Sequence, residues 1–314
     1  MVKKNLLHHL EKTITWKIVA ILQFLAPIIP YPMLLRLGTM VGLTFRFFSK
    51  KRAKRAALIC SRFLAISLSE AQDYIRLSYC NLGQSFMETL RFQRVSSSEI
   101  EEIVEIKGLF HLEKALAQGK GVVLVSGHIG NWELAGIWLG KKGYPINVIG
   151  APQEDHRLNN LLLQLREKYS IQTIFKGFSF RKAIECLKNG QIVGIMLDQD
   201  GGKKGCLVPF LGFPARTSVG PVRLAQKTNS WIVPFIMVRQ RSFPHHHRLE
   251  FFPGFRVEED SNNPLLDALH QCNNFLSSWI KQYPDQWMYE GWLYERWITF
   301  VSCSDNGRNL EKPE

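Results

Sequence analysis

Short apolar runs recur between helix-like segments after Gly108, and this alternation constrains the fold more than any other feature. The runs are GVVLVSG, INVIG, IQTIF, IVGIMLD and WIVPFIMV. The segments between them, such as HLEKALAQGK and RLNNLLLQLREKYS, have helical spacing, and two of them end in the C-cap signals KKG and KNG. Continuous β-branched runs separated by helices are typical of a buried parallel sheet. We therefore predict an α/β fold with a largely parallel central sheet flanked by helices.

The first of these runs ends in a histidine that is followed by a carboxylate. In SGHIGNWELAG, His128 follows Gly127 at a predicted strand end, and Glu133 lies in the helix beyond it. Ligands bind at the carboxyl ends of strands in such sheets. The i, i+5 spacing suits two metal ligands on one helical face poorly. With His128 ahead of the helix, we expect Glu133 to fold back and accept a hydrogen bond from one ring nitrogen.

That hydrogen bond would leave the second nitrogen of His128 basic and facing a hydroxyl group. No GxSxG serine or well-placed cysteine indicates a covalent nucleophile, so the pattern favours direct attack by a substrate hydroxyl. A structural histidine with satisfied hydrogen bonds is the alternative that this motif alone leaves open.

Near the N-terminus, an uncharged segment separates Lys17 from Arg36. Its length is marginal for a membrane-spanning helix, which needs about 20 apolar residues. Its prolines fall in the second half, where they should break or kink a helix, and no small-x-small cleavage site follows. A buried helix of the core is one interpretation. We favour a membrane anchor within residues 1–48, spanning or re-entrant, whose orientation the flanking charges leave open.

Basic residues exceed acidic ones, 40 against 27, which gives a formal charge of +13. Such an excess indicates an anionic partner: nucleic acid, membrane, phosphorylated substrate or acidic carrier protein. The densest cations lie in SKKRAKRAALICSRF, directly after the apolar segment. A solvated helix face is the alternative, but this position favours contact with anionic lipid headgroups. A nucleic-acid-binding protein, which would need a basic stripe with recognition geometry, remains the remote alternative.

We expect one catalytic domain at residues 49–300, helical over 49–105 and α/β over 106–300, followed by a flexible tail at 301–314. The six scattered cysteines form no CxxC pair, so we expect reduced thiols in a protein that faces the cytosol. Consecutive histidines in FPHHHRL alternate faces on extended chain and cannot converge on one ion. We therefore predict no metal site.

Several sequence blocks resemble the bacterial lipid A biosynthesis acyltransferases, within the wider group that shares an H-x4-D/E motif. They are SGHIGNWELAG, the arginine of LLQLREK, LDQDGGKKGCLVPFLGFPARTSVGPVRLAQKTNSWIVPFIMV and YPDQWMYEGWLYERW. The resemblance implies a glycerolipid acyltransferase-like fold. The family commonly ends its last block in a His-Arg-Arg-like cluster, whereas this chain has Glu290, Gly291 and Trp292 with only Arg296 after them. The resemblance therefore implies the reaction, and this departure leaves the identity of the acceptor open.

By this resemblance the chain transfers a fatty acyl group to a hydroxyl of a lipid A precursor at the cytosolic face of the inner membrane. The implied donor is acyl-acyl carrier protein, an acidic partner, and the implied acceptor is an anionic glycolipid. No cofactor is needed. The alternative is the same chemistry on another membrane acceptor, a phosphatidylinositol mannoside or a lysophospholipid, with acyl-CoA as donor.

In this interpretation His128 is the general base, Glu133 orients it, and backbone N–H groups near Gly127 to Gly130 stabilise the oxyanion. Asp198 and Asp200 follow IVGIML at a strand end, where either could instead cap the glycine turn. The resemblance favours Asp198 as an active-site carboxylate. Arg166 could contact a phosphate or the oxyanion, or be a surface cation. The candidates for contact with the substrate or the oxyanion are Gly127, Asn131, Arg166, Asp198 and Asp200.

Overall fold

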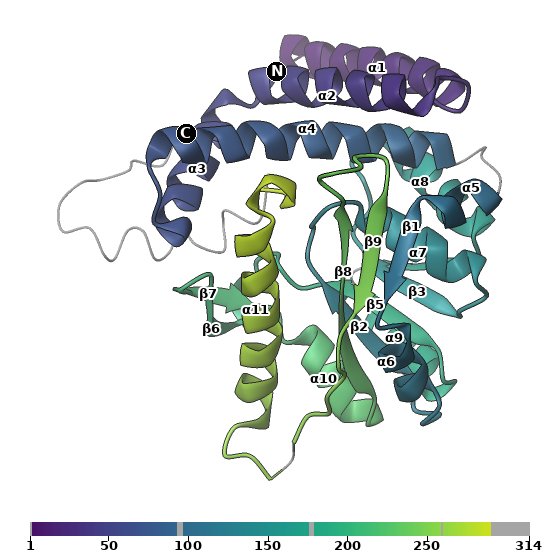
Figure 1. The fold of residues 1–314 in the computed structure, drawn as a ribbon, viewed down its shortest axis with the longest axis vertical. Helices are drawn as coiled ribbons and strands as arrows, with labels where there is room; N and C mark the ends of the chain where they lie inside the picture. The colour runs from purple at the N-terminus through teal and green to yellow at the C-terminus, as the bar shows by residue number, and fades with distance from the viewer. Residues whose placement is uncertain (1, 93–96, 176–178, 259, 290–314) are drawn as a thin grey trace.

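The computed structural model describes residues 2–92, 97–175, 179–258 and 260–289. The predicted tail at 301–314 and the part of the closing block from Glu290 to Trp297 lie outside these ranges. Within them the predicted α/β architecture is confirmed. A central sheet is covered on both faces by helices, and a group of N-terminal helices lies across one end of it (Figure 1).

The central sheet has seven strands in the order β1-β9-β8-β2-β5-β3-β4. They are β1 (Val104–Lys107), β2 (Val122–Ser126), β3 (Ile146–Gly150), β4 (Gln172–Phe175), β5 (Ile192–Met196), β8 (Trp231–Arg239) and β9 (His247–Phe251). All five predicted apolar runs form strands, and they lie parallel to one another. β9 pairs antiparallel with β8, and β1 pairs parallel with β9, so these two strands run in the opposite direction.

Two parts of the sheet differ from the prediction. β1 begins at Val104, inside the stretch that we expected to be helical up to residue 105. Its VEIK sequence continues the acidic helix-like pattern before it, and only the pairing with β9 makes it a strand. A second sheet consists of β6 (Cys206–Phe210) and β7 (Phe213–Thr217), an antiparallel hairpin that the sequence analysis did not predict.

Successive residues of β2 face opposite sides of the sheet, and both sides are buried. Val123 and Val125 pack in a cluster with α9 (Ser179–Lys188), α10 (Gly220–Thr228) and α11 (Pro264–Gln282). Val122 and Leu124 pack with α6 (Leu109–Leu116), α7 (Trp132–Lys141) and α8 (His156–Lys168) on the other side. The absence of a polar face explains why the strands read as continuous apolar runs.

The N-terminal region consists of α1 (Val2–Leu25), α2 (Tyr31–Phe48), α3 (Lys50–Leu64), α4 (Leu68–Phe92) and α5 (Ser97–Glu102). The predicted break at the prolines is confirmed, because α1 ends before Pro27 and α2 begins after Pro30. Figure 1 shows α1, α2 and α4 lying along one another above the end of the sheet. None of the helices in the described ranges combines the length and apolar character that crossing a bilayer requires.

Glycines bring the backbones of α2 and α4 into direct contact. Gly38 and Gly42 on α2 face Gly83 on α4, and we call these three residues the glycine seam. A Cβ atom added at Gly42 would lie 2.0 Å from the backbone oxygen of Tyr79, and one at Gly83 would lie 2.1 Å from the oxygen of Gly38. No rotamer change relieves a clash with backbone, so these positions require glycine.

We predict that Gly42→Ala destabilises the protein by about 1–3 kcal/mol, the usual cost of overpacking. Helix propensity alone would give the opposite sign, since alanine is favoured over glycine by about 1 kcal/mol inside a helix. Urea unfolding in detergent measures the difference. Gly220→Ala is the control, because a Cβ atom there would meet only the Ser218 hydroxyl at 3.6 Å. Equal stability of the two variants would contradict a backbone-tight seam.

Candidate active site

His128 and Asp198 meet at the carboxyl ends of neighbouring parallel strands. β2 pairs with β5 in a register that places Ser126 beside Met196, so the two loops that follow emerge side by side. Nδ1 of His128 lies 2.8 Å from Oδ1 of Asp198, and the backbone N–H of His128 donates to Oδ2 at 2.7 Å. The imidazole also packs edge-on against Trp132, with 4.9 Å between ring centroids. The carboxylate thus holds both the ring and the backbone of His128.

Asp198 is fully buried, which by itself favours the neutral form of its carboxyl group. The charge of His128, its hydrogen bonds and a bond from the indole Nε1 of Trp287 at 2.9 Å outweigh burial, so the pKa of Asp198 lies below its ordinary value. An ionised Asp198 accepts the Nδ1 proton of His128 and fixes that tautomer. In the neutral imidazole, Nε2 then carries no proton and can act as a base.

Glu133 does not bond to His128, so our prediction of that hydrogen bond is wrong. Glu133 lies in the first turn of α7 and accepts hydrogen bonds from Arg166 in the last turn of α8, at 2.6 Å from Nη2 and 3.1 Å from Nε. Arg166 also donates to the hydroxyl of Thr173 on β4 at 3.2 Å. Glu133 thus points toward Arg166 on α8 instead of back toward the turn. Asp198 occupies the position beside His128 that we expected Glu133 to occupy.

The loop that carries His128 uses its own backbone N–H groups to hold its shape. Besides the His128 bond to Asp198, the N–H of Ile129 donates to the oxygen of Gly127 at 2.8 Å. The N–H of Gly130 donates to the oxygen of Gln286 at 2.9 Å. Of the N–H groups that we expected to form an oxyanion hole, those of His128, Ile129 and Gly130 therefore have other acceptors in this conformation.

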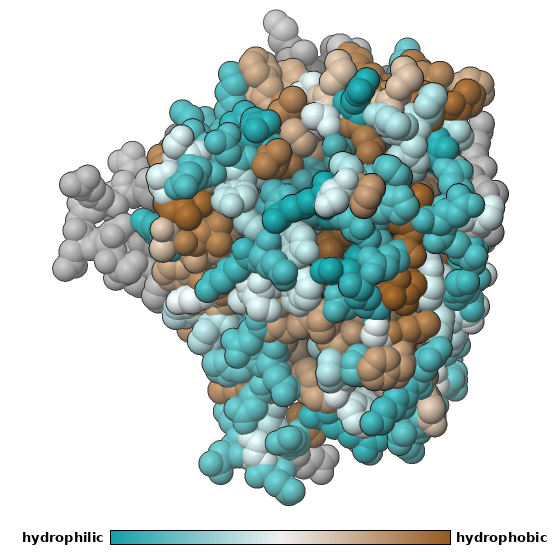
Figure 2. Space-filling view, in the orientation of Figure 1, coloured by the Kyte–Doolittle hydropathy of each residue, from teal (hydrophilic) through white to brown (hydrophobic). Residues whose placement is uncertain are grey.

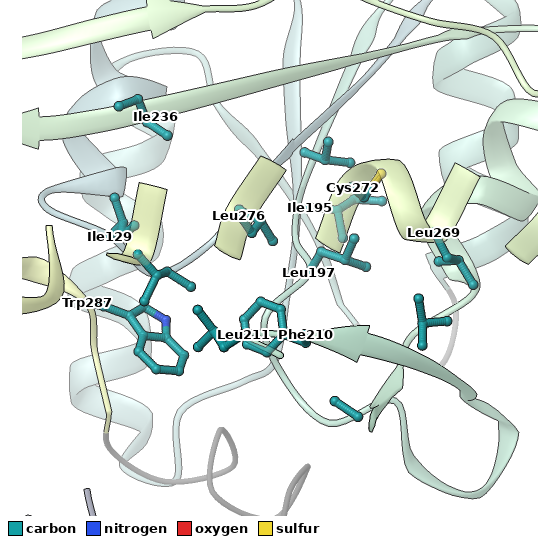
Figure 3. Close-up of a cluster of buried hydrophobic side chains, with 14 of the residues drawn as sticks. Ile129, Ile195, Leu197, Phe210, Leu211, Ile236, Leu269, Cys272, Leu276 and Trp287 are labelled. Atoms are coloured by element: carbon teal, nitrogen blue, oxygen red, sulfur yellow. The ribbon is translucent and has the colours of Figure 1, made fainter. Parts of the chain in front are cut away.

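A segment that the sequence analysis quoted but gave no role bonds to both Asp198 and the His128 loop. The 3₁₀ helix Pro284–Gln286 leads into Trp287, which bonds to Asp198, and into Met288, whose N–H donates to the oxygen of His128 at 2.9 Å. Figure 3 shows Trp287 beside Ile129, with Phe210 and Leu211 nearby in the same cluster. The signal for this role was available: an indole N–H is a donor that needs a partner when buried.

The other three candidates, Gly127, Asp200 and Asn131, differ in what they contact. Gly127 lies against Asp198, since an added Cβ atom would come within 3.0 Å of Oδ2. Asp200 bonds to Arg216 of β7 at 2.9 Å, as expected of a residue that anchors the glycine turn and the β6–β7 hairpin. Asn131 is buried and caps α7 by accepting from the N–H of Leu134 at 3.2 Å. Both remain candidates by the sequence argument alone.

A model of the bacterial lipid A biosynthesis acyltransferase family matches residues 1–299. The chain belongs to this family. The resemblance inferred from the sequence blocks is thereby confirmed. The match spans the N-terminal helices, the central sheet and the segment around Trp287, so the site described above lies wholly inside it.

Among individual members and relatives of the lipid A acyltransferase family, two similar proteins come from Escherichia coli K12. A lipid A biosynthesis palmitoleoyltransferase is 26% identical over 83% of this chain and 84% of that protein. A lipid A biosynthesis lauroyltransferase is 26% identical over 90% of this chain and 91% of that protein. A phosphatidylinositol mannoside acyltransferase of Mycobacterium tuberculosis H37Rv is 29% identical over 48% of this chain. The chain matches only about half the length of that mycobacterial relative.

We predict that Trp287→Phe loses about 1.5–3 kcal/mol of stability at pH 7, because a hydrogen bond to a charged acceptor disappears while an aromatic ring remains. The folded pKa of Asp198 lies below its unfolded value near about 3.9, so the carboxylate stabilises the fold above that pH and less as the pH falls. The difference from wild type should therefore shrink in acid. Urea unfolding at pH 7 and at about pH 2.5, below the unfolded pKa of the carboxyl group, measures it.

Trp231→Phe is the matched control for that experiment. The indole nitrogen of Trp231 is buried and has no hydrogen-bond partner among the described residues. Its removal should cost less and show no dependence on pH. Equal, pH-independent losses in both variants would contradict a stabilising Trp287–Asp198 bond.

Proposed function

We propose that this protein transfers a fatty acyl group from an acyl thioester to a hydroxyl group of a lipid A precursor. The observation that carries the proposal is the Asp198–His128 pair at the carboxyl ends of β2 and β5. Membership of the family supports the acyl transfer. The choice of acceptor is supported by the two Escherichia coli relatives, whose similarity extends over most of this chain.

In the proposed reaction, Nε2 of His128 takes the proton of the acceptor hydroxyl while the hydroxyl oxygen attacks the thioester carbonyl. The tetrahedral intermediate collapses, the carbon–sulfur bond breaks, and the leaving thiolate takes the proton from His128. Asp198 stabilises the imidazolium that exists between these steps. A general base of this kind contributes about 10²- to 10⁴-fold to the rate. The side chain of His128 is 12% exposed, so little water competes for it.

Arg166 is our candidate for a charged substrate contact. Glu133 and Thr173 fix its guanidinium group, and their bonds use three of its five N–H donors. We propose that the remaining N–H groups stabilise the oxyanion or bind a phosphate of the acceptor. Glu133 would then act by holding Arg166, a different role from the one that the sequence motif implied.

We propose acyl-acyl carrier protein as the donor, because an acidic carrier suits a chain of net charge +13. The alternative is the same chemistry on a phosphatidylinositol mannoside or a lysophospholipid with acyl-CoA. The identity of 29% to a phosphatidylinositol mannoside acyltransferase favours this alternative, although that similarity covers only half of each chain.

We also propose that α1 and α2 lie on the lipid bilayer at the cytosolic side of the inner membrane. Large apolar side chains at helical spacing are exposed on both helices, among them Ile14, Ile18 and Ile21 on α1 and Met33, Met40 and Phe47 on α2. We call these six residues the apolar face. Figure 2 shows hydrophobic surface gathered at the upper edge of the molecule, where Figure 1 places both helices. Exposed apolar area of this kind marks membrane or partner contact.

The first helical turns of α3 add positive charge next to that surface. Lys50, Lys51 and Lys54 are exposed, while the opposite side of α3 buries Ala53 and Ala57 in the core. Cations near anionic headgroups contribute about 1 kcal/mol each. Together these features favour a helix pair that rests on the surface of the bilayer.

We predict that His128→Ala abolishes acyl transfer and that Asp198→Asn lowers kcat by about 10²-fold or more, because the wrong tautomer then dominates. Glu133→Gln should weaken transfer less at saturating substrate. The assay follows acyl transfer from acyl-carrier protein and from acyl-CoA at low and high salt. A His128→Ala variant that keeps the wild-type rate would overturn the mechanism, and equal use of acyl-CoA would favour the alternative donor.

The acceptor is tested in cells. Mass spectrometry of lipid A from a strain with and without this gene should show one acyl chain fewer when the gene is absent. Wild-type protein should restore it and His128→Ala should not. Unchanged lipid A together with in vitro transfer to a mannoside or a lysophospholipid would reassign the acceptor.

We predict that Ile21→Glu weakens binding to anionic vesicles by about tenfold or more, since burial of one large apolar side chain contributes about 1.5–3 kcal/mol. Co-sedimentation with vesicles measures the binding. Leu207→Glu is the control, because Leu207 is 69% exposed but lies on the β6–β7 hairpin, away from α1 and α2. Equal binding by all three proteins would contradict the proposed surface.

A further inference from the structure

A buried carboxylate lies beneath the His128 loop, outside the site described so far. Glu88 on α4 is fully buried, as is the ring of His247, and Arg239 is 5% exposed. The guanidinium of Arg239 on β8 donates to both oxygens of Glu88, at 2.7 Å and 2.8 Å. Nε2 of His247 on β9 lies 3.1 Å from Oε1. This cluster joins α4 to the antiparallel edge of the sheet.

Two further side chains bond to the same carboxylate from other directions. The hydroxyl of Tyr31 on α2 donates to Oε1 at 2.8 Å. Nδ2 of Asn131 donates to Oε2 at 2.9 Å. Burial alone would raise the pKa of Glu88, but Arg239 and His247 outweigh it and hold that pKa below its ordinary value. An ionised carboxylate is acceptor-only and offers about four lone-pair sites, so these donors occupy its full capacity.

Asn131 is the link between this cluster and the catalytic loop. Its amide nitrogen bonds to Glu88 and its amide oxygen accepts from the N–H of Leu134, so both ends are used inside the protein. Its side chain is buried, which leaves it poorly placed for an oxyanion. One turn earlier on α4, the hydroxyl of Ser85 donates to the oxygen of Gly130 at 3.3 Å. The same face of α4 thus holds Gly130 and Asn131, directly after His128.

We infer that Glu88 is a positioning residue of the proposed acyl transfer, which acts through Asn131 to set where His128 lies against Asp198 and the acceptor hydroxyl. This inference rests on the proposed function. Glu88 touches none of the reacting groups. Its effect comes from geometry, because a displacement of about 1 Å in a reacting group can cost about 10²-fold in rate.

Asn131→Ser is the variant that tests the link. A serine oxygen still caps α7, but serine is too short to reach Glu88 with a donor. We expect kcat to fall by about 10- to 100-fold, while KM for the acyl donor stays within about twofold. Glu88→Gln is less informative alone, because it leaves Arg239 buried without a counter-charge and endangers folding.

Asn263→Ser is the matched control. Asn263 caps α11 in the same way, accepting from the N–H of Leu266 at 3.4 Å, and it lies on an exposed turn away from Glu88. We expect wild-type kcat and KM from it. If both serine variants keep wild-type kcat, or if KM rises in place of the fall in kcat, the inference is overturned.

Asn131→Asp provides a rescue that a merely structural role would not give. The introduced carboxyl keeps the shape of the amide and faces Glu88. Arg239, His247 and Tyr31 bond to Glu88 from the other sides. Two adjacent carboxylates repel each other when both are ionised, so the pKa of one of them is raised and the pair holds a single proton. Once protonated, the new carboxyl can donate to Oε2 again. We expect kcat relative to wild type to rise as the pH falls, and a ratio that is independent of pH would contradict the link.

The His128→Ala result separates the two proposals. An active His128→Ala variant would overturn the proposed mechanism itself. An inactive His128→Ala variant beside a fully active Asn131→Ser variant would leave the mechanism standing and overturn only the positioning role of Glu88.

Discussion

The ion pair between Glu88 and Arg239 is the contact on which the assembly of this molecule depends. A charge without a partner at complete burial is strongly unfavourable, and loss of one member of such a pair typically costs about 3–5 kcal/mol. Here the pair lies where α4, the sheet and the catalytic loop converge. If α4 moved away from the sheet, one of the two charges would remain buried without its partner. The carboxylate of Glu88 therefore ties α2 and α4 to β8 and to the catalytic loop.

The His128 site follows the same logic with a second buried carboxylate. Asp198 is ionised because His128 and Trp287 supply hydrogen bonds to it, and in return it fixes the ring, the backbone and the tautomer of His128. The Glu133–Arg166 pair is a separate unit that joins α7, α8 and β4. The H-x4-E motif thus contributes its two ends to two separate contacts, His128 to Asp198 and Glu133 to Arg166.

Much of this could be predicted from the sequence, and the rest has identifiable physical reasons for being missed. Strands buried on both faces leave continuous apolar runs, so β2, β5 and β8 were predictable. β3 and β4 are less buried, and they were predictable from their short β-branched runs between helices. The placement of His128 at a strand end followed from the same pattern. The partner of His128 did not, because periodicity gives no strand order, and only the adjacency of β2 and β5 brings Asp198 to it. Glu88 looked like any polar residue of a helix, since contacts across 151 residues leave no local signal. β1 became a strand only through its pairing with β9.

The glycine seam has a consequence for how the molecule would work on a bilayer. Because α2 and α4 touch backbone to backbone, α2 cannot roll or slide without separating from α4. α4 in turn holds the loop of His128 through Ser85 and Glu88. On a lipid surface, this rigid chain of contacts would fix the height of the catalytic nitrogen above the headgroups. The protein could then change that height only by tilting as a whole.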